Sequence, residues 1–131
     1  MNSRTAIKLM LWMLGSVMLF HFSIILKIVP YEITWGGRLE NDREMYAFET
    51  ISVIINLFLY AILLIKGKYI KEVISTRIVN ISLWFFLIVF GLNTIGNVIA
   101  KTTFEKFFAI LTLTFSFLIW TILTKRQSTE D

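Results

Sequence analysis

The chain has no cysteine and a single histidine among its 131 residues. Without cysteine it can form no disulfide, and thiol catalysis and cysteine-based metal centres are excluded. One histidine cannot supply the ligand spacings typical of zinc or haem sites. The phosphate-binding patterns GxxxxGK[ST] and GxGxxG do not occur in the sequence either. We therefore expect no metal and no cofactor.

Charge is also scarce. Only 17% of the residues are charged, whereas about a quarter is usual in soluble domains. The mean hydropathy is +0.73, and a soluble domain of this size has too much surface to hide so much apolar material. The expected environment of most of the chain is therefore a lipid bilayer. The net charge of +4 does not predict a nucleic-acid partner, because the basic residues flank the apolar runs and are typical of topology signals.

Four long apolar runs explain this composition, and they cover residues 7–29, 46–65, 78–99 and 107–123. A helix that crosses a membrane needs about 20 mostly apolar residues, with a range of about 17–25. Backbone groups in lipid must bond within their own segment, so each run predicts a helix. The first run lacks the small-residue cleavage pattern of a signal peptide, and we interpret it as a retained membrane helix.

The connections between the runs are short, except for residues 30–45, and short connections place successive helices antiparallel. The predicted fold is all-α: one domain over residues 1–131, an integral membrane, four-helix up-down-up-down transmembrane bundle. Eight of the thirteen Lys and Arg residues lie at run ends that would share one side of the membrane: Arg4, Lys8, Lys66, Lys68, Lys71, Arg77, Lys125 and Arg126. The positive-inside rule then predicts a multi-pass protein of the cell membrane with both termini cytoplasmic and an outer loop at 30–45.

A polar stretch, YEITWGGRLENDREMYAFET over residues 31–50, leads into the second run and leaves Glu49 inside it. Pro30 is expected to end the first helix, because it cannot donate a backbone hydrogen bond. Asn41 followed by Glu44 resembles a capping box, which predicts that the second helix begins directly after Asn41.

Polar side chains from three predicted helices fall at a similar depth in the outer half of the membrane. The second helix offers an i, i+3 pair on one face and the third helix an i, i+4 pair, and the first helix adds the histidine. These residues are His21, Glu49, Ser52, Asn93 and Asn97. The loop that carries Trp35 and Arg38 is expected to cover them, with Arg38 as a contact for an anion. The sequence thus predicts an outward-facing ligand site at these residues.

Each of these residues also has a structural interpretation. A carboxylate within a membrane is costly and usually faces protein, but Glu49 could instead pair with Arg38 or Arg43 and fix the loop. His21 and the asparagines are also typical interhelical hydrogen-bonding residues. Placed beside Glu49, however, His21 could accept and release a proton near neutral pH. Trp35, next to two glycines, is equally typical of a turn at the membrane surface.

Two functions remain open from the sequence. The first is an accessory or structural subunit, a partner-binding bundle in which the polar cluster holds the helices together and another membrane protein binds outside. The second is a small-ligand or proton-coupled binding or transport protein that uses the polar pocket. Four helices rarely enclose a full transport path, so this second function favours a homodimer. An enzyme is less expected, because a His–Glu pair can act as acid and base but no nucleophile or nucleotide motif accompanies it.

Overall fold

The computed structural model describes residues 1–33, 39–100 and 103–125. It contains four long helices and one short 3-10 helix: α1 (Ser3–Ile25), η1 (Tyr31–Ile33), α2 (Asp42–Lys66), α3 (Thr76–Val98) and α4 (Thr103–Thr124). These described ranges contain no strand. All four long helices are long and apolar enough to cross a membrane. The predictions of an all-α fold and of four apolar helices are therefore confirmed.

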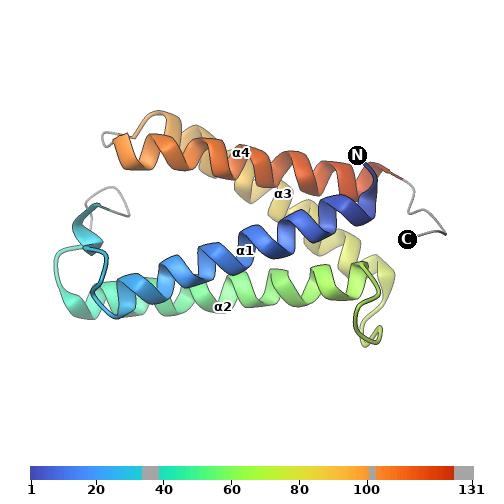
Figure 1. The fold of residues 1–131 in the computed structure, drawn as a ribbon, viewed down its shortest axis with the longest axis horizontal. Helices are drawn as coiled ribbons and strands as arrows, with labels where there is room; N and C mark the ends of the chain where they lie inside the picture. Colours follow the sequence, from blue (N-terminus) through green and yellow to red (C-terminus); the bar gives the residue numbers. More distant parts are fainter. Residues whose placement is uncertain (34–38, 101–102, 126–131) are drawn as a thin grey trace.

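Contacts near both ends of α1 and α2 show that these helices run in opposite directions. At the start of α1, Arg4 donates a hydrogen bond to the carbonyl of Gly67, just after α2, at 3.4 Å. Beyond the end of α1, Lys27 forms an ion pair with Asp42, the first residue of α2. The N-terminus and the last turn of α4 lie at one end of the bundle, and η1 lies at the other (Figure 1). We call this second end the η1 end.

The contact between α3 and α4 is the most extensive between two helices of the bundle. The rings of Phe90 and Phe115 lie 5.0 Å apart, and the hydroxyl of Thr94 donates to that of Thr112 at 2.8 Å. Thr94 comes after Phe90 in α3, whereas its partner Thr112 comes before Phe115 in α4. The two helices therefore run in opposite directions. Each aromatic contact contributes about 0.5–1.5 kcal/mol beyond the area it buries.

The main apolar core lies in the half of the bundle opposite the η1 end, where all four helices contribute side chains. Its fully buried members include Met10, Leu14, Leu59, Leu63, Leu83 and Ile119. Dense packing of this kind fixes the helices at one end. The other half contains fewer buried apolar residues, and the candidate site lies there.

The first helix ends earlier than predicted. Its expected end was residue 29, before Pro30, but α1 ends at Ile25. Lys27 takes a left-handed φ of 62°, and its N–H and that of the next residue bond to carbonyls in the last turn of α1. This is the Schellman pattern, which completes the helix end before the proline is reached. Gly67 and Lys68 end α2 in the same way, again with a lysine at φ 62°.

The start of α2 agrees with the capping prediction. The side chain of Asn41 accepts a hydrogen bond from the N–H of Glu44 at 2.9 Å, and its amide donates to the Glu44 carboxylate at 3.2 Å. These two bonds satisfy a free N–H group at the helix start and orient the carboxylate toward it. The side chains of Asn2 and Ser75 likewise accept from a backbone N–H in the first turn of α1 and of α3.

Candidate functional site

Glu49 is fully buried, at 0% exposure, although it lies only two turns inside α2. Its Oε2 lies 2.5 Å from Nδ1 of His21 on α1, a short bond of the kind formed between charged or strongly polar groups. The His21 side chain is 15% exposed. Glu49 was expected to face protein, within reach of His21, Asn97 or an arginine of its own loop, and the structure brings it against His21.

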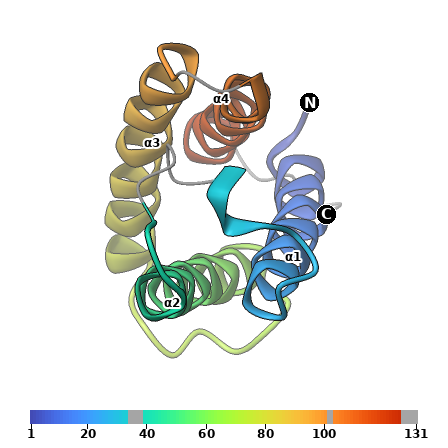
Figure 2. The ribbon, with the colours of Figure 1, turned by 90° about the vertical axis from the view of Figure 1, so that its left-hand side faces the viewer.

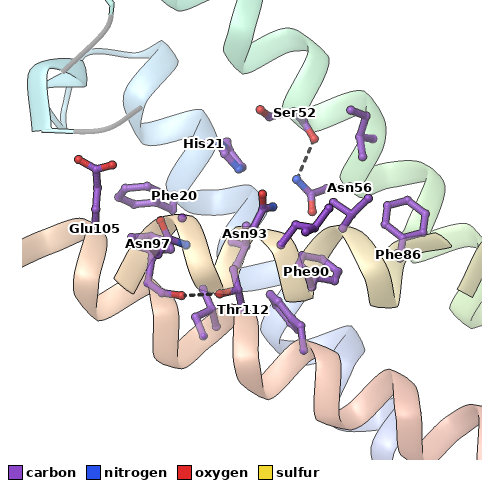
Figure 3. Close-up of a pocket in the computed structure, with 18 of the residues that line it drawn as sticks. Phe20, His21, Ser52, Asn56, Phe86, Phe90, Asn93, Asn97, Glu105 and Thr112 are labelled. Atoms are coloured by element: carbon purple, nitrogen blue, oxygen red, sulfur yellow. Dashed lines mark hydrogen bonds between the residues drawn. The ribbon is translucent and has the colours of Figure 1, made fainter. Parts of the chain in front are cut away.

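A cavity of about 530 Å³ lies beside this pair, between the four helices (Figure 3). Its size falls within the range of about 300–1,000 Å³ that is typical of small-molecule sites. Its walls are mainly aromatic and aliphatic, and a few polar side chains interrupt them. These polar residues are His21, Ser52, Asn56, Asn93, Asn97, Glu105 and Thr112.

The structure brings together most of the residues proposed from the sequence. Four of them line the cavity: His21, Ser52, Asn93 and Asn97. Glu49 does not reach it and lies behind His21, so it orients the imidazole rather than contacting the cavity itself. Trp35 and Arg38 lie outside the described residues. The proposed contact between Arg38 and an anion therefore stays a prediction.

Asn93 and Asn97 turn toward the cavity from one face of α3 (Figure 3). Within residues 1–33, 39–100 and 103–125, neither side-chain amide forms a hydrogen bond with another group of the protein. Interhelical bonds were one of the expectations for both residues, and none is formed in this part of the chain. An amide in apolar surroundings gains free energy when it finds a partner. Both amides are therefore available to a ligand.

Other polar contacts of this region differ from what the sequence indicates. Asn56, a polar residue in the second apolar run, would be expected to bond to another helix, but it donates to the carbonyl of Ser52 in its own helix at 2.8 Å. The bond between helices is made instead by Thr94 and Thr112, a pair that the sequence analysis did not propose. The sequence contains only a weak indication of this bond. Thr112 and Ser116 are small residues one turn apart on α4, a spacing that allows close helix packing but does not identify a bonding partner.

Glu105 is the candidate site residue that the sequence analysis missed. The fourth helix was expected to begin at residue 107, which left Glu105 in the preceding connection. Because α4 begins at Thr103, Glu105 lies in its first turn and lines the cavity. A carboxylate is favoured there by the partial positive charge of the helix start. The signal was Thr102 three residues before Glu105, which matches a capping box.

Aromatic rings form two boundaries of the cavity. Phe20 of α1 contacts Phe104 and Phe108 of α4, with ring centroids 5.7 and 5.5 Å away, and these rings close the side between α1 and α4. Phe90 and Phe115 close the end nearest the main core. Most of the polar lining residues lie toward the η1 end, beside the rings of Phe20, Phe104 and Phe108, and the deeper part is mainly aromatic and aliphatic.

At the η1 end, η1 crosses the middle of the bundle, between the ends of the four helices (Figure 2). Ile24, Leu39 and Met45 form a small buried cluster here, against which Phe20 and Tyr31 pack. Partial burial raises the pKa of Tyr31 above its usual value. Because Phe20 belongs both to this cluster and to the cavity wall, the connection between α1 and α2 is packed against the site.

The ion pair of Lys27 and Asp42 lies at the same end. Its hydrogen bond and the charge of Asp42 raise the pKa of Lys27. A raised pKa means that the pair contributes to stability below the usual lysine pKa, and that this contribution is lost as the pH rises through the raised value. Both side chains are half-exposed, so solvent screens the pair and its contribution is small.

No protein-family model, curated protein or solved structure matches this chain. Its fold and site therefore define a class rather than a family. The class is an all-helical protein with four helices long and apolar enough to cross a membrane, which enclose a cavity that is polar at one end.

Proposed function

We propose that the protein is a multi-pass membrane protein that binds a small molecule in the cavity between its four helices. The observation that carries the proposal is the convergence of His21, Asn93 and Asn97 on an aromatic cavity of about 530 Å³. A few polar groups placed on an apolar wall are typical of ligand sites. The amides have no partner within the described part of the chain, and a ligand would supply one.

The His21–Glu49 bond has a role in this function. With the Nδ1 proton directed at Glu49, Nε2 is the remaining hydrogen-bonding atom of the ring. Nε2 of a neutral imidazole accepts a hydrogen bond, and that of a protonated imidazole donates one. Glu49 therefore fixes the orientation of the ring and leaves Nε2 as the ring atom that a ligand can contact.

Insertion into the cell membrane is supported by the apolar outer surface of the bundle. Large side chains exposed along the helices include Trp12, Leu19, Ile54, Phe85, Ile88, Leu113 and Phe117. Such a surface is costly in water and favourable in lipid. The distribution of Lys and Arg supports an up-down-up-down topology with both termini in the cytoplasm and the η1 end outside.

Single cysteines test this orientation cleanly, because the chain has none of its own. Glu40 and Lys71 are exposed residues in the two opposite connections. In intact cells, a maleimide that cannot cross the membrane should label Glu40→Cys. It should label Lys71→Cys only after lysis. The reverse pattern would overturn the orientation.

Two glycines of α3 provide a matched test of ligand binding. Gly96 lines the cavity and Gly91 does not, and a Cβ at either position meets no atom within 4 Å. Native mass spectrometry of the purified protein should show a bound small molecule that persists in Gly91→Phe and is lost in Gly96→Phe. Equal occupancy in the two variants, or no bound molecule in the unaltered protein, would contradict the proposal.

A second function, as a subunit that associates with a second copy of this chain, is favoured by a groove of about 560 Å³ beside α1. It is lined by Lys8, Leu11, Trp12, Gly15, Ser16, Leu19, Tyr60 and Tyr69. Small residues such as Gly15 and Ser16 allow helices to approach closely in a membrane. Light scattering in detergent should give a dimer mass that Gly15→Leu reduces to that of a monomer. A monomer before the substitution would exclude this function.

A further inference from the structure

We infer that the molecule bound in the cavity is a single-chain amphiphile with an uncharged hydroxyl or carbonyl head group, and that it enters sideways from the bilayer between α2 and α3. The inference rests on the proposed binding function and adds the ligand class and its route. Its two supports are the closure of the cavity on three sides and the change from polar to aromatic lining along its length.

Three of the four sides between helices are closed near the η1 end. Phe20 packs against Phe104 and Phe108 between α1 and α4. The bond of His21 to Glu49 joins α1 to α2. The side between α3 and α4 has the most extensive helix contact of the bundle. A molecule of the size of the cavity cannot pass through these sides without separating packed helices.

The side between α2 and α3 differs. Its contact is the least extensive of the four pairs of neighbouring helices, and the rings of Phe58 and Phe86 meet on the side nearest the main core. Nearer the η1 end, several of the residues of these helices that line the cavity are exposed to the outside, among them Ile55, Leu92 and Asn93. The cavity thus reaches the outer surface between α2 and α3. In a membrane this surface faces lipid.

The lining indicates an elongated amphiphile. His21, Asn93 and Asn97 lie toward the η1 end, whereas Phe86 and Phe115 lie at the far end. From Asn97 to Phe86 the helix rises about 16 Å at 1.5 Å per residue, which is about half of the 30 Å hydrocarbon thickness of a bilayer. A molecule with a polar head and one apolar chain matches this length and this change of polarity.

The polar groups at this end indicate an uncharged head group. Asn93 and Asn97 are neutral amides, and they would not offset the cost of removing an ionised head group from water. Asn93 and Asn97 offer both donors and acceptors, which match a hydroxyl or a carbonyl group.

Photolabelling in phosphatidylcholine vesicles tests the inference. The probes are hexadecanol and hexadecanoic acid, each with a diazirine midway along the chain, and the labelled residues are located by mass spectrometry. The alcohol should label residues of the cavity wall such as Phe90 and Leu111 more than the lipid-facing Leu113. It should also label them more strongly than the acid does. Equal labelling by the two probes would overturn the uncharged head group.

The entrance has its own pair of variants. Leu92 is 63% exposed and lines the cavity, whereas Ile88, one turn away, is 61% exposed and does not. Leu92→Trp should reduce cavity labelling about tenfold, the factor that corresponds to about 1.4 kcal/mol, and Ile88→Trp should leave it unchanged. Both positions face outward, so both variants should fold, and thermal unfolding checks this. Labelling that is the same in both variants would overturn the lateral entrance.

The binding function and this inference can fail separately. If the purified protein carries a water-soluble molecule that Gly96→Phe removes, the cavity binds a ligand and the amphiphile inference is wrong. If neither a bound molecule nor cavity labelling is found, both are wrong. Cavity labelling that Gly96→Phe abolishes and Gly91→Phe preserves supports both.

Discussion

Nδ1 of His21 and Oε2 of Glu49 lie 2.5 Å apart and connect α1 to α2 across 28 positions of the chain. The carboxylate is fully buried, while part of the imidazole reaches the cavity. A buried carboxylate that loses a partner costs more free energy than a partly exposed neutral ring that loses one. Glu49 therefore depends on His21 more than His21 depends on Glu49.

This asymmetry predicts different effects of the two single substitutions. His21→Leu should lower the free energy of unfolding by about 3 kcal/mol, because it removes one partner of a carboxylate that stays buried. Glu49→Leu should lower it by about 1 kcal/mol, because the ring can still reach the cavity. The double variant should be more stable than His21→Leu alone. Unfolding by denaturant in detergent measures all three, and equal single effects with simple additivity would contradict the asymmetry.

A second prediction concerns the bond between Thr94 and Thr112. Thr94→Val keeps the shape of the side chain and removes the donor, so it should cost about 0.6 kcal/mol and at most about 2 kcal/mol. Thr114→Val is the matched control, because among the residues that the structure describes the Thr114 hydroxyl bonds only to the Ile110 carbonyl of its own helix. A double-mutant cycle with Thr112→Val measures the coupling, and zero coupling would mean that the bond contributes nothing.

The sequence was sufficient for the four helices, and it gave His21 as one of several candidate partners of Glu49. The apolar runs determine which segments are helical, and depth along the helices brings those two residues to one level. Asn41 and Glu44, read as a capping box, also located the start of α2 correctly. These features depend on local sequence or on distance along a helix axis, and both can be read without knowing how the helices pack.

Features that depend on helix rotation could not be predicted. Exposed residues such as Ile54 and Phe85 are as apolar as the buried Leu59 and Leu83, so the pattern does not distinguish the packed face from the outer face. The Thr94–Thr112 bond was missed for this reason. The end of α1 was missed for a local reason, because a lysine takes the left-handed position at which glycine is usual.

The end of α2 supplies a third prediction, with opposite effects at adjacent residues. A Cβ on Gly67 would lie 2.8 Å from the ring of Tyr69, over which Arg4 is placed at 4.9 Å. Gly67→Ala should therefore displace the ring and cost about 1–3 kcal/mol. Lys68 has a φ of 62°, and Lys68→Gly should stabilise the protein by up to about 1 kcal/mol. Thermal unfolding should show a lower melting temperature for Gly67→Ala and a higher one for Lys68→Gly. A change in the same direction for both variants would contradict this account of the turn.

The last prediction separates the asparagines of the cavity from one that holds the fold. Asn80 accepts a hydrogen bond from Lys66 at 2.8 Å, which joins α3 to α2, so Asn80→Leu should cost about 1.5–3 kcal/mol, the usual range for a bond to a charged group. Asn93 has no hydrogen bond within the described residues. Asn93→Leu should therefore change the stability by less than about 0.5 kcal/mol and yet reduce cavity labelling by the alcohol probe. Thermal unfolding and photolabelling of the same two samples measure both quantities. If Asn93→Leu were as destabilising as Asn80→Leu and left the labelling unchanged, Asn93 would be a structural residue and the polar end of the cavity would not be a binding site.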